Sequence, residues 1–596
     1  MPVTSATLRR CLAAITLGAA TITLAVPAHA QHKLGPQQTS FKAPTIAAAS
    51  DEAERAIKRF TYPNGWKAEL WAAEPNVAHG VAFDVADDGR VFVAESFRAW
   101  RGVPDIRGIM DWLDEDLACK SVDDRLAMMQ RHLKPDQMAG YYTNTERVRL
   151  LRDPQGTGKA TISTVFAENF ATPLDGVAAG VLARGKDVFF ANIPNVWRLR
   201  DADGDGVADE RRSISYGHGI RVGFLGHDLH GLVFGPDGRL YFSIGDRASM
   251  IRTEGHMVGT ADSGAVFRCE PDGSHLEMVY QGLRNPQDMV FDAWGNLFTG
   301  DNNSDGGDQA RWTWLVEGGD SGWRIGWQFL EGRNAPNPRG AWNSEKMWHP
   351  QNDSQPAYLT PPIKNISSGP SGVSYYEGTG SGPEWNDTFT LCDFRGSSSG
   401  SGLWKFKHKA KGAGFEIVDD QKFIWSVNAT DGHWGPDGSF WVLDWFDGWE
   451  PVGKGRIYRF SDPRHSQSEL VRETKAILAE GFAKRSVGDL SKWLNHANYR
   501  VRLGAQFELA ARQDDKSLLK AALSAKTLQA RIHGIWGVGQ VARAQRNTGV
   551  SGARVDSLER LIPLLADTDA KVRAVAATVL GDARYGRSYD ALIRLT

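Results

Sequence analysis

Three short segments concentrate the side chains that could carry chemistry. They are His227-Asp228-Leu-His230, Arg284-Asn285-Pro-Gln287 and Asp301-Asn302-Asn303-Ser304-Asp305. A neutral histidine can accept a proton from a hydroxyl group, and a neighbouring arginine can stabilise negative charge as it develops. We therefore expect His227 to act as a general base with Arg284 beside it, and the three segments to meet on one face of the fold.

An acidic loop carries a second pattern. Asp201-Ala-Asp203-Gly-Asp205-Gly-Val-Ala-Asp209 alternates carboxylates with glycines, as calcium loops of the EF-hand kind do. Asp153-Pro-Gln-Gly-Thr-Gly-Lys-Ala-Thr161 repeats the same turn without most of these carboxylates. We expect the first loop to bind a structural calcium ion through Asp201, Asp203, Asp205 and Asp209, and the second loop to bind none. The alternative is that both are simple Asp/Gly turns.

A repeated phrase indicates how these residues are positioned. It consists of an apolar pair, a turn built on Asp-Gly, and an alternating aromatic strand that ends in an acidic residue. Two strands of this kind cannot bury both faces alone, so the copies must pack side by side around an axis. Four copies are clear and two are weaker: Gly80–Glu95, His230–Asp246, Met289–Asp301 and His433–Asp444, then Val177–Asn192 and Gly372–Asp393.

Six copies predict a six-bladed β-propeller over residues 60–461, with a β-sandwich as the alternative. Insertions at about 100–142 and 326–362 should form loops over one face, and the helical spacing within 100–137 predicts a small cap. The 64 glycines and 21 tryptophans of the chain suit many short strands joined by turns.

Residues 469–596 change to a helical period. Three aligned segments, Leu494–Leu509, Leu528–Val538 and Leu565–Leu580, resemble HEAT repeats, in which small residues let paired helices stack closely. These helices could also dock another protein. The last segment is apolar and lacks a polar cap, so we expect further chain beyond it.

The N-terminal residues 1–30 predict a cleaved signal peptide, because two arginines precede an apolar run that closes on Ala28-His29-Ala30. Residues 31–59 should form a linker. We expect the mature protein to be exported to the periplasm or outside the cell. A net charge of -2 argues against a nucleic-acid partner.

The motifs resemble those of soluble glucose and sorbosone dehydrogenases, six-bladed propellers that use pyrroloquinoline quinone and calcium. The resemblance rests on Gly226–Asp246, Gly282–Gln287 and Asn303–Trp323, and it covers about residues 60–461. The layout of propeller followed by helices is similar to exported, membrane-bound dehydrogenase-like proteins of planctomycete-type bacteria. Such a protein would oxidise a sugar or alcohol and pass electrons to an external acceptor, such as a cytochrome c domain outside this chain.

The resemblance also implies roles for single residues. His227 matches the catalytic base, and Arg284 stabilises charge. The backbone carbonyls near Asp301 and Asn302 match a cofactor-site calcium. The residues that would contact the quinone are Asn285, Gln287, His230 and Arg395.

One segment departs from the resemblance. Asn428-Ala-Thr-Asp-Gly-His433 has no arginine where the glucose enzymes grip the cofactor with two. Two other functions therefore stay open. One is a calcium-dependent hydrolase of the lactonase type, in which a bound cation polarises a carbonyl group. The other is a scaffold without catalysis that binds glycans or proteins.

Overall fold

A computed structural model describes residues 42–329, 342, 345–347, 349, 352, 354, 359–547 and 555–595. The predicted signal peptide lies outside these residues, as do part of the predicted linker and much of the predicted 326–362 loop.

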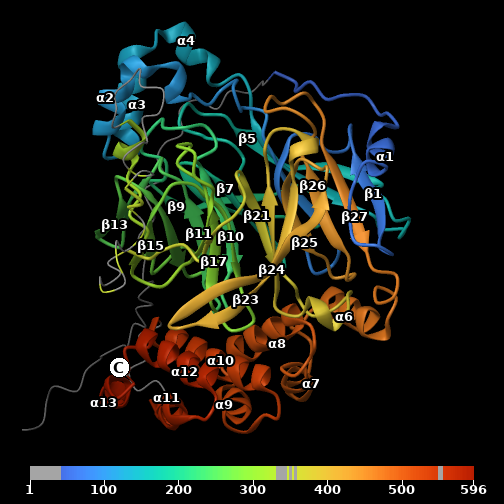
Figure 1. Ribbon diagram of the computed structural model, residues 1–596, viewed down its shortest axis with the longest axis vertical. Helices are drawn as coiled ribbons and strands as arrows, with labels where there is room; N and C mark the ends of the chain where they lie inside the picture. Colours follow the sequence, from blue (N-terminus) through green and yellow to red (C-terminus); the bar gives the residue numbers. More distant parts are fainter. Residues whose placement is uncertain are drawn as a thin grey trace, which may run out of the picture. The chain divides into compact units, whose positions relative to one another are not determined.

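Six sheets carry the first part of the chain (Figure 1). Blades 1 to 3 are β2 (Gly80–Val85), β3 (Val91–Glu95), β4 (Glu146–Arg152), β5 (Ile162–Phe170); β6 (Gly180–Arg184), β7 (Asp187–Asn192), β8 (Asn195–Arg200), β9 (Glu210–Tyr216); and β10 (Leu229–Phe234), β11 (Leu240–Ile244), β14 (Gly264–Cys269), β15 (Glu277–Leu283), β19 (Gly319–Asp320). Blades 4 to 6 are β16 (Pro286–Phe291), β17 (Leu297–Asp301), β18 (Arg311–Trp314), β20 (Lys364–Asn365); β21 (Pro370–Tyr375), β22 (Thr388–Asp393), β23 (Gly402–Lys411), β24 (Gly414–Trp425); and β25 (Ala429–Trp434), β26 (Phe440–Asp444), β27 (Arg456–Ser461), β1 (Lys67–Ala73).

The first strands of the six blades form a closed ring. Contacts run from β2 to β6, β10, β16, β21, β25 and back to β2. The N-terminal strand β1 completes blade 6 by pairing antiparallel with β27, which joins the two ends of the propeller. The predicted six-bladed propeller is therefore confirmed, and both weaker repeats are blades. A hairpin of β12 (Ser249–Thr253) and β13 (His256–Thr260) extends from blade 3.

The apolar core lies between neighbouring blades. Phe189 and Ile193 of blade 2, for example, share a buried cluster with Leu229 and Phe242 of blade 3. The Asp-Gly phrases form the turns between first and second strands. Gly238 adopts φ +81° in this turn, a backbone conformation that side chains with a Cβ rarely take.

The first insertion forms the predicted small cap. Its core includes Met128 and Met129, which pack with Val222 and Phe224 of the loop that precedes blade 3. Asp116 of the cap accepts the N–H groups of Val222 at 2.6 Å and Gly223 at 3.1 Å. The cap thus holds the loop that leads to His227. The elements of the cap are η1 (Ile106–Gly108), η2 (Met110–Trp112), α2 (Leu113–Ala118), α3 (Val122–His132) and α4 (Pro135–Gly140). Outside the cap, the N-terminal helix α1 (Glu52–Ile57) packs on β1.

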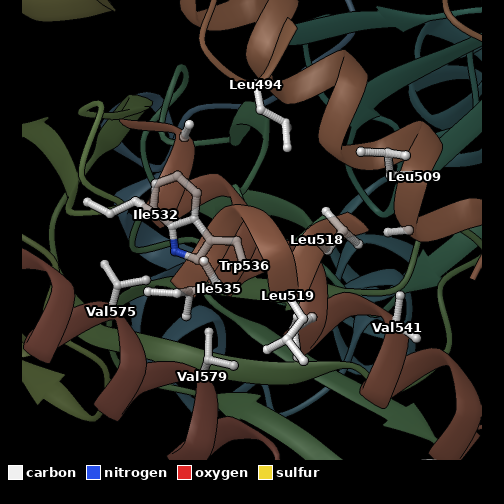
Figure 2. Close-up of a cluster of buried hydrophobic side chains, with 14 of the residues drawn as sticks. Leu494, Leu509, Leu518, Leu519, Ile532, Ile535, Trp536, Val541, Val575 and Val579 are labelled. Carbon is white, nitrogen blue, oxygen red and sulfur yellow. The ribbon is translucent and has the colours of Figure 1, made fainter. Parts of the chain in front are cut away.

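The C-terminal part is helical, and its buried side chains form one large cluster (Figure 2). Ser468, Ser486 and Asn498 accept backbone N–H groups at the starts of three helices, which satisfies donors that have no partner within the helix. A Cβ on Gly534 would lie 2.4 Å from Ala522 N, so a small residue allows these helices to approach closely. The helices are α6 (Glu469–Glu480), α7 (Val487–Trp493), α8 (Tyr499–Ala511), α9 (Asp515–Ser524), α10 (Leu528–Asn547), α11 (Val555–Glu559), η6 (Ile562–Ala566), α12 (Ala570–Asp582), η7 (Gly586–Ser588) and α13 (Tyr589–Ile593).

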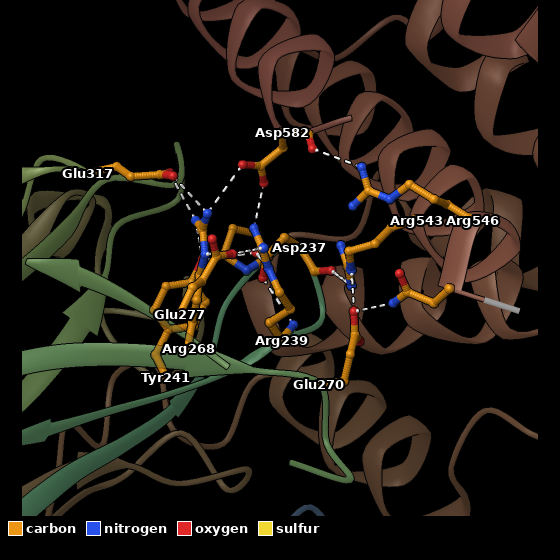
Figure 3. A network of polar contacts seen from close by, with 12 residues as sticks. Asp237, Arg239, Tyr241, Arg268, Glu270, Glu277, Glu317, Arg543, Arg546 and Asp582 are labelled. Atoms are coloured by element: carbon orange, nitrogen blue, oxygen red, sulfur yellow. Dashed lines mark hydrogen bonds and ion pairs between the residues drawn. The ribbon is translucent and has the colours of Figure 1, made fainter. Parts of the chain in front are cut away.

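Polar contacts join these helices to the Asp-Gly turns of the propeller (Figure 3). Asp582 of α12 pairs with Arg239 and Arg268 of blade 3. Arg543 of α10 donates to Glu270 Oε1 at 2.7 Å. Phe41–Thr596 accordingly fall into one compact unit.

Helix α8 crosses the turns of several blades. Arg500 donates to Val85 O of blade 1 at 2.8 Å and pairs with Glu377 of blade 5 at 2.9 Å. Gln506 donates to Pro236 O of blade 3 at 2.6 Å. The helix therefore lies across this end of the ring. Among the described helices, none has the length and apolar character needed to cross a bilayer.

Candidate active site

The acidic residue that ends each clear repeat lies at the end of a second strand, beside the start of the first strand. In three blades it accepts backbone N–H groups there. Glu95 accepts from Ala78 at 3.0 Å, and Asp444 accepts from Asn428 at 3.2 Å. Asp301 accepts from the residues at 284 and 285. In these blades the repeated acid at the end of the second strand holds the backbone near the start of the first strand.

Blade 3 uses the same position differently. Asp246 Oδ1 lies 2.7 Å from His227 Nδ1, and Trp323 Nε1 donates to Asp246 Oδ2 at 3.0 Å. Burial raises the pKa of the Asp246 carboxyl, but the charges of His227 and Arg284 and the two hydrogen bonds outweigh it, so this pKa lies below its ordinary value. An ionised, fully enclosed carboxylate therefore faces the histidine.

This contact sets the state of the His227 ring. A carboxylate accepts a hydrogen bond, so the proton of the neutral ring resides on Nδ1 and the lone pair on Nε2. His227 is 5 % exposed, and among the described residues nothing bonds its Nε2. The Phe224 ring lies 5.4 Å from the His227 ring, and the Arg107 guanidinium of the cap lies 4.5 Å from Phe224. Nε2 is thus a positioned base below the cap.

Arg284 contacts Asp246 through the backbone. The Arg284 carbonyl accepts the Asp246 N–H at 2.8 Å, and the guanidinium lies 5.6 Å from the Trp323 ring. Its N–H groups donate to Gln328 Oε1 at 3.1 Å and Asp305 Oδ2 at 2.7 Å. Arg284 is therefore a buried, fixed positive charge one blade away from His227.

Two buried amide atoms beside Arg284 have no hydrogen-bond partner within the described part of the chain. They are Asn285 Oδ1, an acceptor, and Gln328 Nε2, a donor. Buried polar atoms are nearly always paired, so these two atoms are candidates for bonding a polar ligand.

Asp301 and Asn302 lie beside this group. The Asp301 carboxylate is fully buried and accepts N–H groups from Arg284, Asn285 and Arg311. Asn302 Oδ1 accepts the Asn303 N–H at 2.9 Å. The predicted cation would bind backbone carbonyls of this segment, while the Asp301 carboxylate holds the surrounding chain in place.

The remaining predicted contacts lie elsewhere. His230 and Gln287 line the central channel. Burial lowers the pKa of His230, whose ring nitrogens lie 2.9 Å from Gly226 O and 3.4 Å from Ala179 O. Arg395 belongs to blade 5, where both its Nε and Nη2 donate to Asp393.

The acidic loop brings three of its four carboxylates together. Oxygens of Asp201, Asp203 and Asp209 lie within 4.8 Å of one another, whereas Asp205 accepts the Val207 N–H at 2.7 Å and is not part of the group. In the second loop, Asp153 accepts N–H groups from Thr157 and Gly158, and these bonds hold the turn.

Sequence reasoning did not assign a role at the site to Asp246, Trp323, Phe224 or Gln328. Asp246 carried a usable signal, since it is the repeated acid of the blade whose first strand follows His227. Gln328 carried none, because its proximity to Arg284 depends on a long insertion.

Fold and geometry define a six-bladed propeller with a histidine–aspartate pair and a buried arginine at one end of its ring. Residues 52–449 match the family described as "Domain of unknown function (DUF7133)", and the chain belongs to that family. No curated protein matches.

Several solved structures are similar at low identity. A glucose dehydrogenase is 14% identical, with 66% of this chain and 99% of that chain covered and a TM-score of 0.43. The PQQ-bound aldose sugar dehydrogenase from Streptomyces coelicolor is 14% identical, with 67% and 99% covered and a TM-score of 0.38. The holo PQQ domain of pyranose dehydrogenase from Coprinopsis cinerea is 10% identical, with 67% and 97% covered and a TM-score of 0.39.

Proposed function

We propose that this chain is an oxidoreductase that oxidises a hydroxyl group of a sugar or related compound with a pyrroloquinoline quinone-type cofactor. The observation that supports it most directly is the His227–Asp246 contact beside Arg284. The reaction class, oxidation of a hydroxyl group, is proposed from the resemblance of the sequence motifs around these residues to those of sugar dehydrogenases.

The residues around Arg284 fit such a group. Asn285 Oδ1 can accept a hydrogen bond and Gln328 Nε2 can donate one, and both are buried without a partner among the described residues. When bound, the quinone would accept the two electrons and the hydrogen of the carbon that is oxidised. His230, Gln287 and Arg395 stay predicted contacts of the cofactor.

The chain's own groups would handle the proton and the charge. His227 Nε2 removes the hydroxyl proton, and Asp246 stabilises the imidazolium that results. Arg284 stabilises negative charge on the oxygen that accepts electrons. The cap, which carries Arg107 over Phe224, would restrict the site to small substrates.

Further features belong to the same proposal. A calcium ion in the acidic loop would be structural, and a second one near Asp301 and Asn302 would serve the cofactor. The helices would form a HEAT-like solenoid that can dock a partner. The protein would be exported after cleavage at residue 30 and would pass its electrons to an external acceptor.

A calcium-dependent hydrolase of the lactonase type is the second candidate. The observation that favours it is the acidic lining of the channel, which includes Asp84, Asp288 and Asp431 and would repel an anionic quinone. The same His227 would then activate water.

The test is turnover of the full chain after addition of the quinone and calcium, with a panel of sugars and alcohols and an artificial electron acceptor. His227→Asn should lower kcat/KM about 10²- to 10⁴-fold without changing Tm. His218→Gln is the matched control, because His218 is equally buried but bonds only Ser215 and Ser249. It should retain turnover.

Wild-type protein without any quinone-dependent oxidation would overturn the proposal. Hydrolysis of lactones that is lost in His227→Asn would then establish the second candidate.

A further inference from the structure

The central channel contains a second group of polar side chains, apart from the His227 site. A cavity of about 50 Å³ lies among the first strands of all six blades. Its lining mixes apolar and polar residues, and its acidic residues lie on β2, β16 and β25. Neither the proposed oxidation nor its cofactor uses these charged residues.

Three of the lining side chains converge. Asp288 of blade 4 and Asp431 and His433 of blade 6 each offer one ligand atom, and these atoms lie within 4.8 Å of one another. Blade 5 lies between blade 4 and blade 6, which carry these residues. A Cβ on Gly372 of blade 5 would lie 2.2 Å from Asp431 Oδ1, so the glycine leaves the space through which this carboxylate reaches toward blade 4.

Backbone N–H groups hold both carboxylates in place. Asp288 accepts from Val373 at 2.8 Å and from Met289 at 2.7 Å. Asp431 accepts from Phe83 at 3.0 Å and from Gly432 at 2.7 Å. Each carboxylate oxygen can accept more than one bond, so these contacts orient the groups without exhausting them. His433 Nε2 lies 3.1 Å from Asp431 Oδ1, and its ring packs at 5.2 Å against Phe83.

We propose that Asp288, Asp431 and His433 bind a zinc ion in the central channel. Two carboxylates and one neutral imidazole balance a divalent charge, and imidazole favours zinc over calcium or magnesium. Zinc–ligand bonds of about 2.0–2.2 Å require small side-chain rotations that bring the three atoms closer. A fourth position remains open to water.

Such an ion would connect blades 4 and 6 across the axis. Adjacent blades already share strand contacts and apolar clusters, whereas blades 4 and 6 have blade 5 between them. The proposed oxidation assigns no role to Asp288, Asp431 or His433, although two predicted cofactor contacts, His230 and Gln287, line the same channel.

The test is calorimetric titration of chelator-treated full-length protein with zinc chloride, in an Asp203→Asn/Asp209→Asn background that removes the carboxylates of the acidic loop. We expect one site, a rise in Tm on zinc addition, and a cobalt absorption spectrum typical of nitrogen and oxygen ligands. Asp288→Asn and His433→Asn should each weaken zinc binding at least about 100-fold, more than the usual loss from an outer-shell change.

Asp84→Asn is the matched control. Asp84 lines the same cavity and accepts the Ala183 N–H at 2.8 Å, as Asp288 and Asp431 do for their neighbouring blades, but it is not part of the converging group. This variant should bind zinc as the background protein does. Absence of zinc binding would overturn the proposal. So would a zinc affinity equal to that of the background protein in whichever of Asp288→Asn and His433→Asn is well folded.

Discussion

At the scale of single residues, one repeated position does two kinds of work. Glu95, Asp301 and Asp444 bond the backbone at the top of their own blades. Glu95 and Asp301 also accept side-chain N–H groups, from Arg149 and Arg311. Asp246 occupies the equivalent place in blade 3, where within the described chain its carboxylate bonds only the side chains of His227 and Trp323. A structural acid of the repeat has thus become the group that orients the candidate base.

Asp246→Asn should therefore reduce turnover about 10²- to 10⁴-fold, because an amide can stabilise the wrong tautomer of His227 and cannot balance an imidazolium. The measurement is kcat/KM across pH on whichever substrate proves active. Asp246→Glu should recover part of the rate, since it restores the carboxylate.

Asp444→Asn serves as the control for this change. It alters the same repeat position in blade 6, where within the described residues the acid accepts hydrogen bonds from the backbone N–H groups of Asn428 and Phe446. We expect lower stability with little loss of turnover. Equal losses of turnover in the two Asn variants would contradict the positioning role of Asp246.

At the scale of elements, the loops 201–209 and 153–161 share the same turn but differ in the number of carboxylates that they carry. In both, the first aspartate accepts backbone N–H groups of the turn: Asp201 from Gly204 and Gly206, and Asp153 from Thr157 and Gly158. The first loop adds carboxylates that converge, and like charges held this close repel one another unless a cation lies between them.

Calcium should consequently stabilise the first loop. We expect chelation to lower Tm by about 5 °C, as loss of a tightly bound ligand would. Asp203→Asn/Asp209→Asn should remove this calcium response, while Asp205→Asn should retain it because Asp205 is not part of the converging group. Thermal unfolding with and without calcium measures both. A full calcium response in the double variant would refute the assignment.

At the scale of the whole molecule, the helices close one end of the ring. Arg500 and Gln506 of α8 contact turns of blades 1, 3 and 5. His227 lies at the opposite ends of these strands, where the cap packs on its loop. Substrates should therefore approach from the cap side, and the domain boundary predicted between residues 461 and 469 separates two parts that are held together by polar contacts.

Cleavage at an engineered protease site within 462–468 should leave the two fragments associated. Asp582→Ala with Arg543→Ala should weaken this association at least about tenfold, since each change removes charged hydrogen bonds to blade 3. Size-exclusion chromatography of the cleaved protein measures it. Arg512→Ala is the control, because Arg512 bonds Glu508 and neighbouring helix residues. Fragments that separate in the wild type would contradict the interface.

The sequence by itself determined the number of blades, the turns and the helical part. These features follow from patterns that repeat over short stretches, such as the Asp-Gly turn and the period-two strands. Such patterns predict local structure because they reflect local backbone preferences. It also selected His227 and Arg284, because each precedes a strand at the same phase of the repeat.

The tertiary structure decided which side chains meet. Asp246 stands 19 residues from His227, and Trp323, which donates to Asp246, stands 77 residues from it. Asp288 and His433 belong to different blades and converge only because the ring of strands closes around an axis. Contacts of this kind depend on how the blades pack. A local sequence pattern does not determine the distance between strands of two blades that a third blade separates.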